Sequence, residues 1–287
     1  MPDNIAFATM VGDEPIFLPI WIGYYSRFVP KDHLFILVDG FDRRLPPEVA
    51  GCQVIRLPRS APVPGWDVAR WKMITAFTQM LLHRFEVVAF NDVDEILVLD
   101  PAQGNDLIGS LMRAKEVGVI SPFAFEVIHR VDLEAPFDPK RPVLGQRRFG
   151  RLNASYCKPC ITARPVTWSL GGHCADFPQL TLDRDLFLFH LRYLDHGLLL
   201  ERQASRQAMM VNAGVAGAGW AKGQDEMTGF LQSFVDSGAP EAGDFSFDWQ
   251  RKRISKGWAQ DAHGFWRHTK LHNRRTYTIP DRFFDVF

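Results

Sequence analysis

The stretch "VVAFNDVDEILVLDP" (residues 87–101) places four carboxylates among side chains that are otherwise almost all apolar. Asp92, Asp94 and Glu95 directly follow an apolar run, and Asp100 follows a second one. An isolated carboxylate that is buried costs several kcal/mol, and a hard divalent cation removes that cost. Mg²⁺ and Mn²⁺ typically bind through one or two carboxylates together with substrate phosphates. The Asp-x-Asp pattern therefore predicts a metal–diphosphate site, with solvated turn residues as the alternative.

Around this stretch, apolar runs alternate with helical patterns, which indicates an α/β fold. We expect strands at 4–10, 33–40, 51–57, 86–90, 95–99, 117–121 and 186–192, and helices at 15–28, 67–85, 105–118 and 198–210. Residues 137–160 are basic and punctuated by Pro and Gly, so we expect loops and short strands there, on a substrate-facing surface. A Gly/Ala-rich link and a tail with many aromatic and basic residues follow the last of these helices.

Composition restricts the possible partners. The 287 residues include 33 basic and 33 acidic ones, so bulk attraction to nucleic acid or to an anionic membrane is not expected. No apolar run approaches the roughly 20 residues of a spanning helix, and the first residues do not resemble a signal peptide. We expect a cytoplasmic protein without a transmembrane segment, with peripheral membrane association left open. Four cysteines are too few for a disulfide framework in a chain of this size.

Carboxylates also mark the ends of other predicted elements. Ligands of open α/β sheets bind at the carboxyl ends of the strands, where Asp39 and Asp92 both lie. Asp39 could equally be a plain turn residue before Gly40. Asp13 and Glu14 precede the first predicted helix, and we expect them to interact favourably with its dipole.

Several segments resemble those of a known family. "FNDVDEILVLDP" (90–101) resembles the Asp-x-Asp-Glu-Phe-Leu segment of family-2-like glycosyltransferases with the GT-A fold. "FATMVGDEPIFLPIWIGYY" (7–25) is similar to their opening strand, Asp-Glu pair and first helix. "VARWKM" (68–73) is similar to an Arg-Leu segment of related nucleotide-sugar transferases, with Trp71 in place of Leu. Short pieces that look like acceptor-side and metal-side segments occur at 158–160, 171–173 and 189–192.

This resemblance implies a GT-A fold, with a mixed central sheet flanked by helices. The nucleotide-sugar-binding and catalytic domain would span residues 1–195. A helical C-terminal extension, 196–287, would pack on that domain or form part of it. The roles implied for the first half are base and ribose contacts for Met10, Val11 and Asp39, a ribose or metal contact for Asp92, metal ligation for Asp94 and a diphosphate contact for Arg70. A buried ion pair with one of the carboxylates is the alternative for Arg70.

In the second half, the resemblance implies that Lys158 meets the leaving diphosphate and that His190 completes the metal shell. His173 would contact the acceptor or compete for the metal. A solvated Lys158 and a structural, hydrogen-bonded His190 are the alternatives. Glu126 is the first candidate for a catalytic base, and Asp132 and Asp176 are two others. All three are expected in loops that follow strands.

The expected activity is that of a metal-dependent glycosyltransferase that uses Mn²⁺ or Mg²⁺. It would move a sugar from a UDP- or GDP-sugar to a hydroxyl of a glycan, lipid-linked or protein acceptor, with inversion. A nucleotidyltransferase or a haloacid-dehalogenase-like phosphohydrolase could use the same Asp-x-Asp site. A non-enzymatic zinc module built on Cys157, Cys160, His173 and Cys174 is the third alternative.

Overall fold

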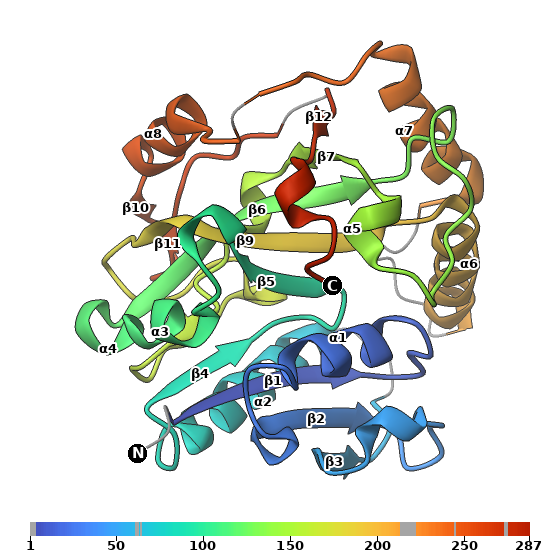
Figure 1. Ribbon diagram of the computed structural model, residues 1–287. Helices are drawn as coiled ribbons and strands as arrows, with labels where there is room; N and C mark the ends of the chain where they lie inside the picture. Colours follow the sequence, from blue (N-terminus) through green and yellow to red (C-terminus); the bar gives the residue numbers. More distant parts are fainter. Residues whose placement is uncertain (1–3, 61–62, 64, 213–221, 244, 273–274) are drawn as a thin grey trace.

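The protein is a mixed α/β structure in which helices flank a central mixed sheet (Figure 1). The computed structural model describes residues 4–60, 63, 65–212, 222–243, 245–272 and 275–287. The main path of the sheet runs in the order β12-β7-β6-β8-β4-β1-β2-β3, and β9 joins β5 to β6. The α/β class and the mixed sheet predicted from the sequence are therefore confirmed. The predicted Gly/Ala-rich link falls on 213–221, outside the described residues.

Four parallel strands form the N-terminal half of the sheet, in the order β3-β2-β1-β4. They are β1 (Ile5–Val11), β2 (Leu34–Asp39), β3 (Gln53–Leu57) and β4 (Val87–Phe90). Alternate residues of β1 and β4 belong to two different apolar clusters, because successive side chains of a strand point to opposite faces. Helix α1 (Phe17–Tyr25) covers one face and α2 (Trp66–Leu81) covers the other.

The rest of the sheet is mostly antiparallel. Its strands are β5 (Glu95–Leu99), β6 (Val119–Ile128), β7 (Phe149–Leu152), β8 (Ile161–Thr162), β9 (Leu182–Tyr193) and β12 (Tyr277–Thr278). Strand β8 lies antiparallel between β4 and β6, and β9 runs parallel to β6 but antiparallel to β5. A two-stranded ribbon lies apart from this sheet and consists of β10 (Ala259–Gln260) and β11 (Trp266–Arg267).

Strand β6 is longer than the sequence predicts, because it continues past Ser121 to Ile128. Its pairing with β9 shifts register between Ser121 and Phe123, on either side of Pro122. A proline cannot donate a ladder hydrogen bond and is tolerated at such irregularities. The proline therefore interrupts the pairing locally without ending the strand, which places Glu126 inside the sheet.

Helices after β5 differ in length and position. They are α3 (Leu107–Met112), α4 (Ala114–Val117), α5 (Val143–Gln146), α6 (His196–Asn212), α7 (Gln224–Asp236) and α8 (Asp248–Lys256). The single helix expected at 105–118 is divided at Arg113 into α3 and α4. Residues 196–287 also contribute β12, which pairs with β7 and so belongs to the central sheet. None of the described helices is long and apolar enough to cross a membrane.

Strands β6 and β7 approach closely at Gly150 of β7, so a substitution of Gly150 tests this packing. A Cβ atom at Gly150 would lie 2.6 Å from the backbone oxygen of Glu126. We expect Gly150→Ala to lower the free energy of unfolding by about 1–3 kcal/mol, as overpacking does. The control is Gly229→Ala in α7, where a Cβ meets nothing within 4 Å and stabilisation of up to about 1 kcal/mol is expected. Urea titrations that give both variants equal stability would contradict this packing.

Candidate functional site

The first feature of the site is a carboxylate held between two cations just beyond the end of β4. The Nη2 of Arg70, on α2, donates to Asp92 Oδ1 at 3.4 Å, and the Nζ of Lys158 donates to Asp92 Oδ2 at 3.3 Å. Burial alone would raise the pKa of Asp92, but Lys158 and Arg70 hold it well below its usual range. The structure thus brings together three residues that the sequence selected from separate segments.

Lys158 is itself buried, with 3% of its surface exposed, so the alternative of a solvated surface lysine is wrong. Its Nζ donates to Glu95 Oε1 at 2.6 Å, and the carboxyl of Glu95 is fully buried. Burial favours the neutral amine, yet the adjacent Glu95 and Asp92 outweigh it and raise the pKa of Lys158 above its ordinary value. Glu95 and Asp92 therefore favour the charged form of Lys158.

Asp94 belongs to a second ion-pair group, which the sequence analysis did not find. Arg202, on α6, contacts Asp94 Oδ2 at 3.5 Å and Glu14 Oε1 at 2.9 Å through its Nη2. Its guanidinium carbon also lies 4.4 Å from the ring centre of Phe17. Burial would raise the pKa of Asp94, but Arg202 and other cations keep it below its usual value. Arg202 is 108 residues from Asp94, so no local pattern in the sequence signals this contact.

The predicted role of Asp13 and Glu14 at a helix dipole is wrong. Helix α1 begins at Phe17 and has no acidic residue in its first turn. Asp13 forms an ion pair with Arg43, and Glu14 reaches Arg202 instead. Long-range ion pairs, rather than the dipole, therefore decide where these two carboxylates lie.

Glu126 lies within β6, so its expected place in a loop is wrong. Its carboxylate accepts from Arg151 Nε at 2.5 Å, and its Oε1 lies 3.3 Å from His190 Nδ1. Burial would raise the pKa of Glu126, but His190 and Arg151 lower it to about 2. Such a carboxylate is a weak base near neutral pH. Of the other two candidates, Asp132 pairs with Arg130, and Asp176 accepts a hydrogen bond from the backbone N–H of Thr167.

The rings of both candidate histidines lie near the ring of Tyr156. The ring centre of His190 is 4.1 Å from that of Tyr156, and the ring centre of His173 is 5.4 Å from it. The Nδ1 of His173 lies 2.7 Å from the backbone oxygen of Ser155. Burial and the charge of Lys158 lower the pKa of His173 to about 4, so this imidazole is neutral at neutral pH.

The residues predicted to contact a base and ribose lie at the ends of neighbouring parallel strands. Met10 and Val11 end β1 and are buried, and Asp39 ends β2. The Oδ1 of Asp39 accepts a hydrogen bond from the backbone N–H of Ser60 at 2.7 Å. β1 lies between β2 and β4, so these residues share an edge of the sheet with Asp92.

The donor set at this edge fits one kind of metal site. Within the described part of the chain, no group of three or more His, Cys, Asp and Glu side chains could hold a metal ion. Asp92 and Asp94 form a set of two carboxylates, which suits Mg²⁺ or Mn²⁺ when substrate phosphates supply further ligands. The predicted three-ligand set of Asp92, Asp94 and His190 is not such a group among the described residues; the Nδ1 of His190 lies 3.3 Å from Glu126 Oε1 instead.

The lack of a three-ligand group among the described residues also counts against a zinc module. Burial raises the pKa of the thiols of Cys157 and Cys160 to about 12, whereas zinc binds thiolates. The Sγ of Cys157 already accepts a hydrogen bond from the backbone N–H of Ala124 at 3.3 Å. No three-ligand group includes these cysteines in the described ranges.

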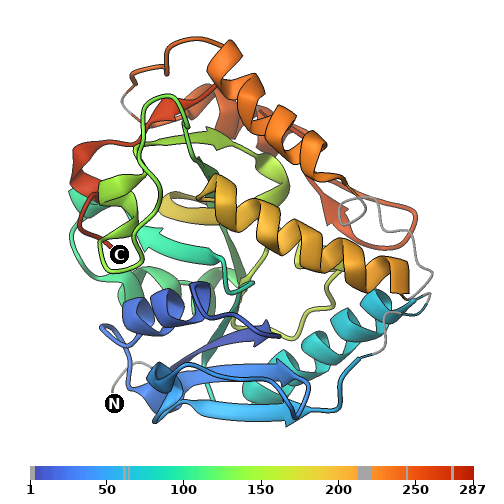
Figure 2. The same cartoon turned by 90° about the vertical axis from the view of Figure 1, so that its right-hand side faces the viewer.

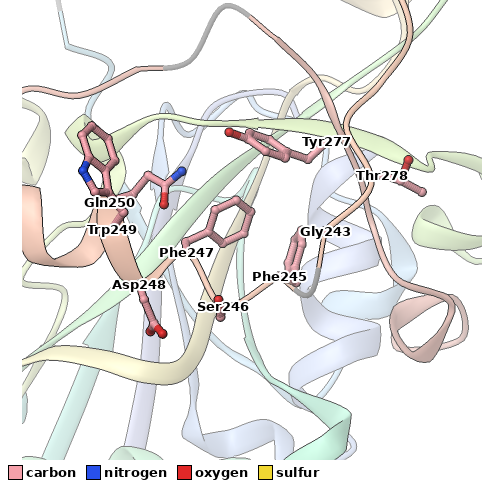
Figure 3. Close-up of a pocket in the computed structure, with 9 residues that line it drawn as sticks. All are labelled: Gly243, Phe245, Ser246, Phe247, Asp248, Trp249, Gln250, Tyr277 and Thr278. Atoms are coloured by element: carbon pink, nitrogen blue, oxygen red, sulfur yellow. The ribbon is translucent and has the colours of Figure 1, made fainter.

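A cavity lies away from this charged edge. Its volume is about 290 Å³, and its lining comes from Gly243, residues 245–250, Tyr277 and Thr278 (Figure 3). Phe245 and Phe247 in its wall have positive φ angles of 64° and 53° and pack into the core against Phe125. Four of its nine lining residues are aromatic and Asp248 is the single charged one among them, so this cavity lacks the cations that Arg70 and Lys158 provide beyond β4.

Comparisons with known proteins identify no family. No family model matches the chain, and no curated protein matches it significantly. A solved structure titled as a mycobacterial protein is 20% identical over 46% of this chain and 45% of its own length, with a TM-score of 0.29. A mannose-1-phosphate geranyltransferase from Thermus thermophilus is 11% identical over 80% of this chain and 68% of its own, with a TM-score of 0.27. Such low TM-scores carry no argument about activity.

Removing Lys158 tests the buried ion pair. Lys158→Met leaves Glu95 without its cation, so we expect a loss of about 3–5 kcal/mol in the free energy of unfolding. Adding Glu95→Gln removes the stranded charge and should recover part of that loss. Denaturant titrations of the single and double variants provide the measurement. A double variant at least as unstable as Lys158→Met would contradict the pairing.

Glu14 predicts a dependence of stability on pH. Burial, only partly offset by Arg202, raises its pKa from 4.5 to about 7 in the folded chain. The folded state therefore binds this proton more tightly than the unfolded state, and stability falls as pH rises from about 4.5 to about 7. The total for this group is about 3 kcal/mol at most.

Glu14→Gln removes this titration. The stability of the wild type relative to Glu14→Gln should thus decrease between pH 5 and 7 and stay level above about pH 7. Urea titrations at several pH values measure this difference. A difference that does not vary over this range would show that the pKa of Glu14 is not raised.

Proposed function

We propose that this protein is a glycosyltransferase of the GT-A type, which moves a sugar from a nucleoside-diphosphate donor to a hydroxyl acceptor. The observation that carries the proposal is Asp92, flanked by Arg70 and Lys158 just beyond β4. β1 and β4 are neighbours, and the chain continues from β1 to β2 and β3 on the other side. Ligands of open α/β sheets bind at such a point, where the strand order reverses.

The charges at this edge suit a diphosphate. Arg70 presents a planar guanidinium that can bind two phosphate oxygens at once, and Lys158 supplies a point charge that Glu95 holds in place. Negative charge grows on the diphosphate as the sugar departs, and preorganised cations stabilise it without further rearrangement. Met10, Val11 and Asp39 lie on the adjacent strand ends, where the nucleoside would extend.

Two aspartates hold a metal ion in this proposal. Asp92 and Asp94 would hold Mn²⁺ or Mg²⁺, which supplies additional positive charge to the leaving group when bound. His190 does not join them in a three-ligand group among the described residues, so substrate phosphates would supply the remaining ligands; its Nδ1 lies 3.3 Å from Glu126 Oε1 instead. We therefore assign Glu126 the role of holding His190 rather than that of the base.

A nucleotidyltransferase is the second candidate, because the same cations would bind the phosphates of a nucleoside triphosphate. Arg70 and Lys158 contact oxygens and do not determine whether a bond to carbon or to phosphorus breaks. The products distinguish the two reactions. A glycosyltransferase releases a nucleoside diphosphate, whereas a nucleotidyltransferase releases pyrophosphate from a triphosphate and a sugar phosphate.

The experiment is a turnover screen of UDP- and GDP-sugars with and without Mn²⁺. We expect release of nucleoside diphosphate with at least one donor, and Asp94→Asn should lower the Mn²⁺-dependent rate by about 100-fold, as the loss of a transition-state contact does. The matched control is Asp225→Asn, at an exposed position of α7, which should turn over like the wild type.

Three outcomes would count against the proposal. Pyrophosphate release from a triphosphate and a sugar phosphate, without donor turnover, would identify a nucleotidyltransferase. Release of inorganic phosphate from simple phosphate esters would identify a phosphohydrolase. Failure to turn over any donor would reject the glycosyltransferase.

A further inference from the structure

The segment Gly171-Gly172-His173 lies against the helix that carries Arg70. A Cβ atom at Gly172 would lie 2.6 Å from the ring of Trp71, on α2, so the backbone packs directly on this indole. The guanidinium carbon of Arg70 lies 5.6 Å from the centre of the same ring. Figure 2 shows the loops of this region, in yellow, beside α2, in cyan. The segment therefore flanks one of the two donor cations.

Tyr156 connects the imidazole of His173 to the other donor cation. The ring centres of Tyr156 and His173 lie 5.4 Å apart, and the Nζ of Lys158 lies 5.3 Å from the ring centre of Tyr156. The same Nζ donates to Asp92 at 3.3 Å. Contacts on two sides, through Trp71 and through Tyr156, thus place His173 beside the cations proposed to bind the diphosphate.

The hydrogen bond of His173 determines which ring nitrogen carries the proton. Its Nδ1 lies 2.7 Å from the backbone oxygen of Ser155, and a carbonyl oxygen only accepts, so Nδ1 must donate. Burial and the charge of Lys158 lower the pKa of His173 to about 4, which keeps the imidazole neutral at neutral pH. A neutral imidazole with its proton on Nδ1 has a lone pair on Nε2. This Nε2 is therefore a hydrogen-bond acceptor.

Glycine at position 171 leaves Nε2 uncovered on one side. A Cβ atom at Gly171 would lie 2.6 Å from Nε2 and 2.5 Å from Cδ2 of His173. Gly171 and Gly172 have φ angles of 71° and 62°, in the left-handed region that favours glycine. The imidazole is half-buried, and its Nε2 has no hydrogen-bond partner among the described residues. The segment thus presents an open acceptor beside the donor cations.

An acceptor of this kind selects a hydroxyl. The oxygens of a diphosphate are themselves acceptors, so they would bind Arg70 and Lys158 but not Nε2. The sugar of the donor is bonded to that diphosphate, so its hydroxyls come closest to the two cations. An acceptor molecule that displaces the diphosphate in line approaches from the opposite face of the sugar. This geometry favours a hydroxyl of the donor sugar over the acceptor contact that the sequence predicts for His173.

We propose that His173 accepts, through Nε2, a hydrogen bond from a hydroxyl of the donor sugar and so determines which sugars the site takes. This inference rests on the proposed glycosyltransferase function and adds a specificity residue to it. A site built to hydrogen-bond a hydroxyl discriminates against a sugar that lacks it, because the protein group is then left unpaired. With its low pKa, His173 is too weak a base to remove the proton of this hydroxyl, so it orients the sugar.

Kinetics with a nucleotide sugar that turns over test this contact, with the matching nucleoside diphosphate as a competitive inhibitor. His173→Phe keeps a ring but no acceptor. We expect it to lower kcat/KM for the nucleotide sugar about ten-fold, the effect of losing one hydrogen bond, and to leave inhibition by the nucleoside diphosphate unchanged. His173→Gln, which can accept through Oε1, should recover part of the loss. Monodeoxy analogues of the sugar identify the hydroxyl, because its removal should cost the wild type about ten-fold and His173→Phe nothing further.

Two glycine variants test the open side of Nε2 without changing His173. Gly171→Ala should reproduce the loss seen in His173→Phe, because the added methyl group crowds Nε2. The matched control is Gly238→Ala, where φ is also positive, at 90°, but a Cβ meets nothing within 4 Å, so this variant should turn over like the wild type. Thermal unfolding of every variant checks that the fold persists.

Two kinetic results would overturn this inference and keep the glycosyltransferase. In one, His173→Phe discriminates against every monodeoxy analogue as the wild type does. In the other, His173→Phe weakens the nucleoside diphosphate as much as the nucleotide sugar, which would place His173 at the diphosphate. Absence of turnover with any nucleotide sugar would reject the glycosyltransferase itself, and this inference with it.

Discussion

The structure depends on cations that neutralise the buried carboxylates between β4 and β5. Glu95 is fully buried, and the Nζ of Lys158 lies 2.6 Å from it. Three residues after Lys158 the chain enters β8, the strand that joins β4 to β6. The ion pair thus fixes the connection between the parallel half and the antiparallel half of the sheet. Breaking such a buried pair strands a charge, so this connection cannot loosen cheaply.

The cations around these carboxylates make contacts of different lengths. Arg70 and Arg202 approach Asp92 and Asp94 at 3.4 and 3.5 Å, at the long limit of a hydrogen bond. Lys158 is held much more closely by Glu95. In the proposed donor site, a phosphate would replace the long contact of Arg70 with Asp92, while Glu95 holds Lys158 in place. Arg202 is held more closely by Glu14, at 2.9 Å, than by Asp94.

The sequence predicts the parallel half well because its signals are local. Short apolar runs bounded by turns indicate buried strands, and Asp39 and Asp92 mark where such strands end. The remainder depends on contacts between distant segments. Glu126 can lie inside β6 only because β7 supplies Arg151 and β9 supplies His190, and Pro122 conceals the length of that strand. Nothing in the sequence of α6 distinguishes Arg202 from the other charged residues of that helix, so its contact with Asp94 could not be predicted.

The placement of Arg202 follows from a short connection that hydrogen bonds hold in place. β9 ends at Tyr193 and α6 begins at His196, so few residues separate the sheet from the helix that carries Arg202. Asp195 in this connection accepts from the backbone N–H of Leu198 at 3.2 Å and from Arg147 Nη2 at 3.2 Å. These bonds fix the direction in which α6 leaves the sheet. The direction of α6 therefore brings Arg202 within 3.5 Å of Asp94 and 2.9 Å of Glu14.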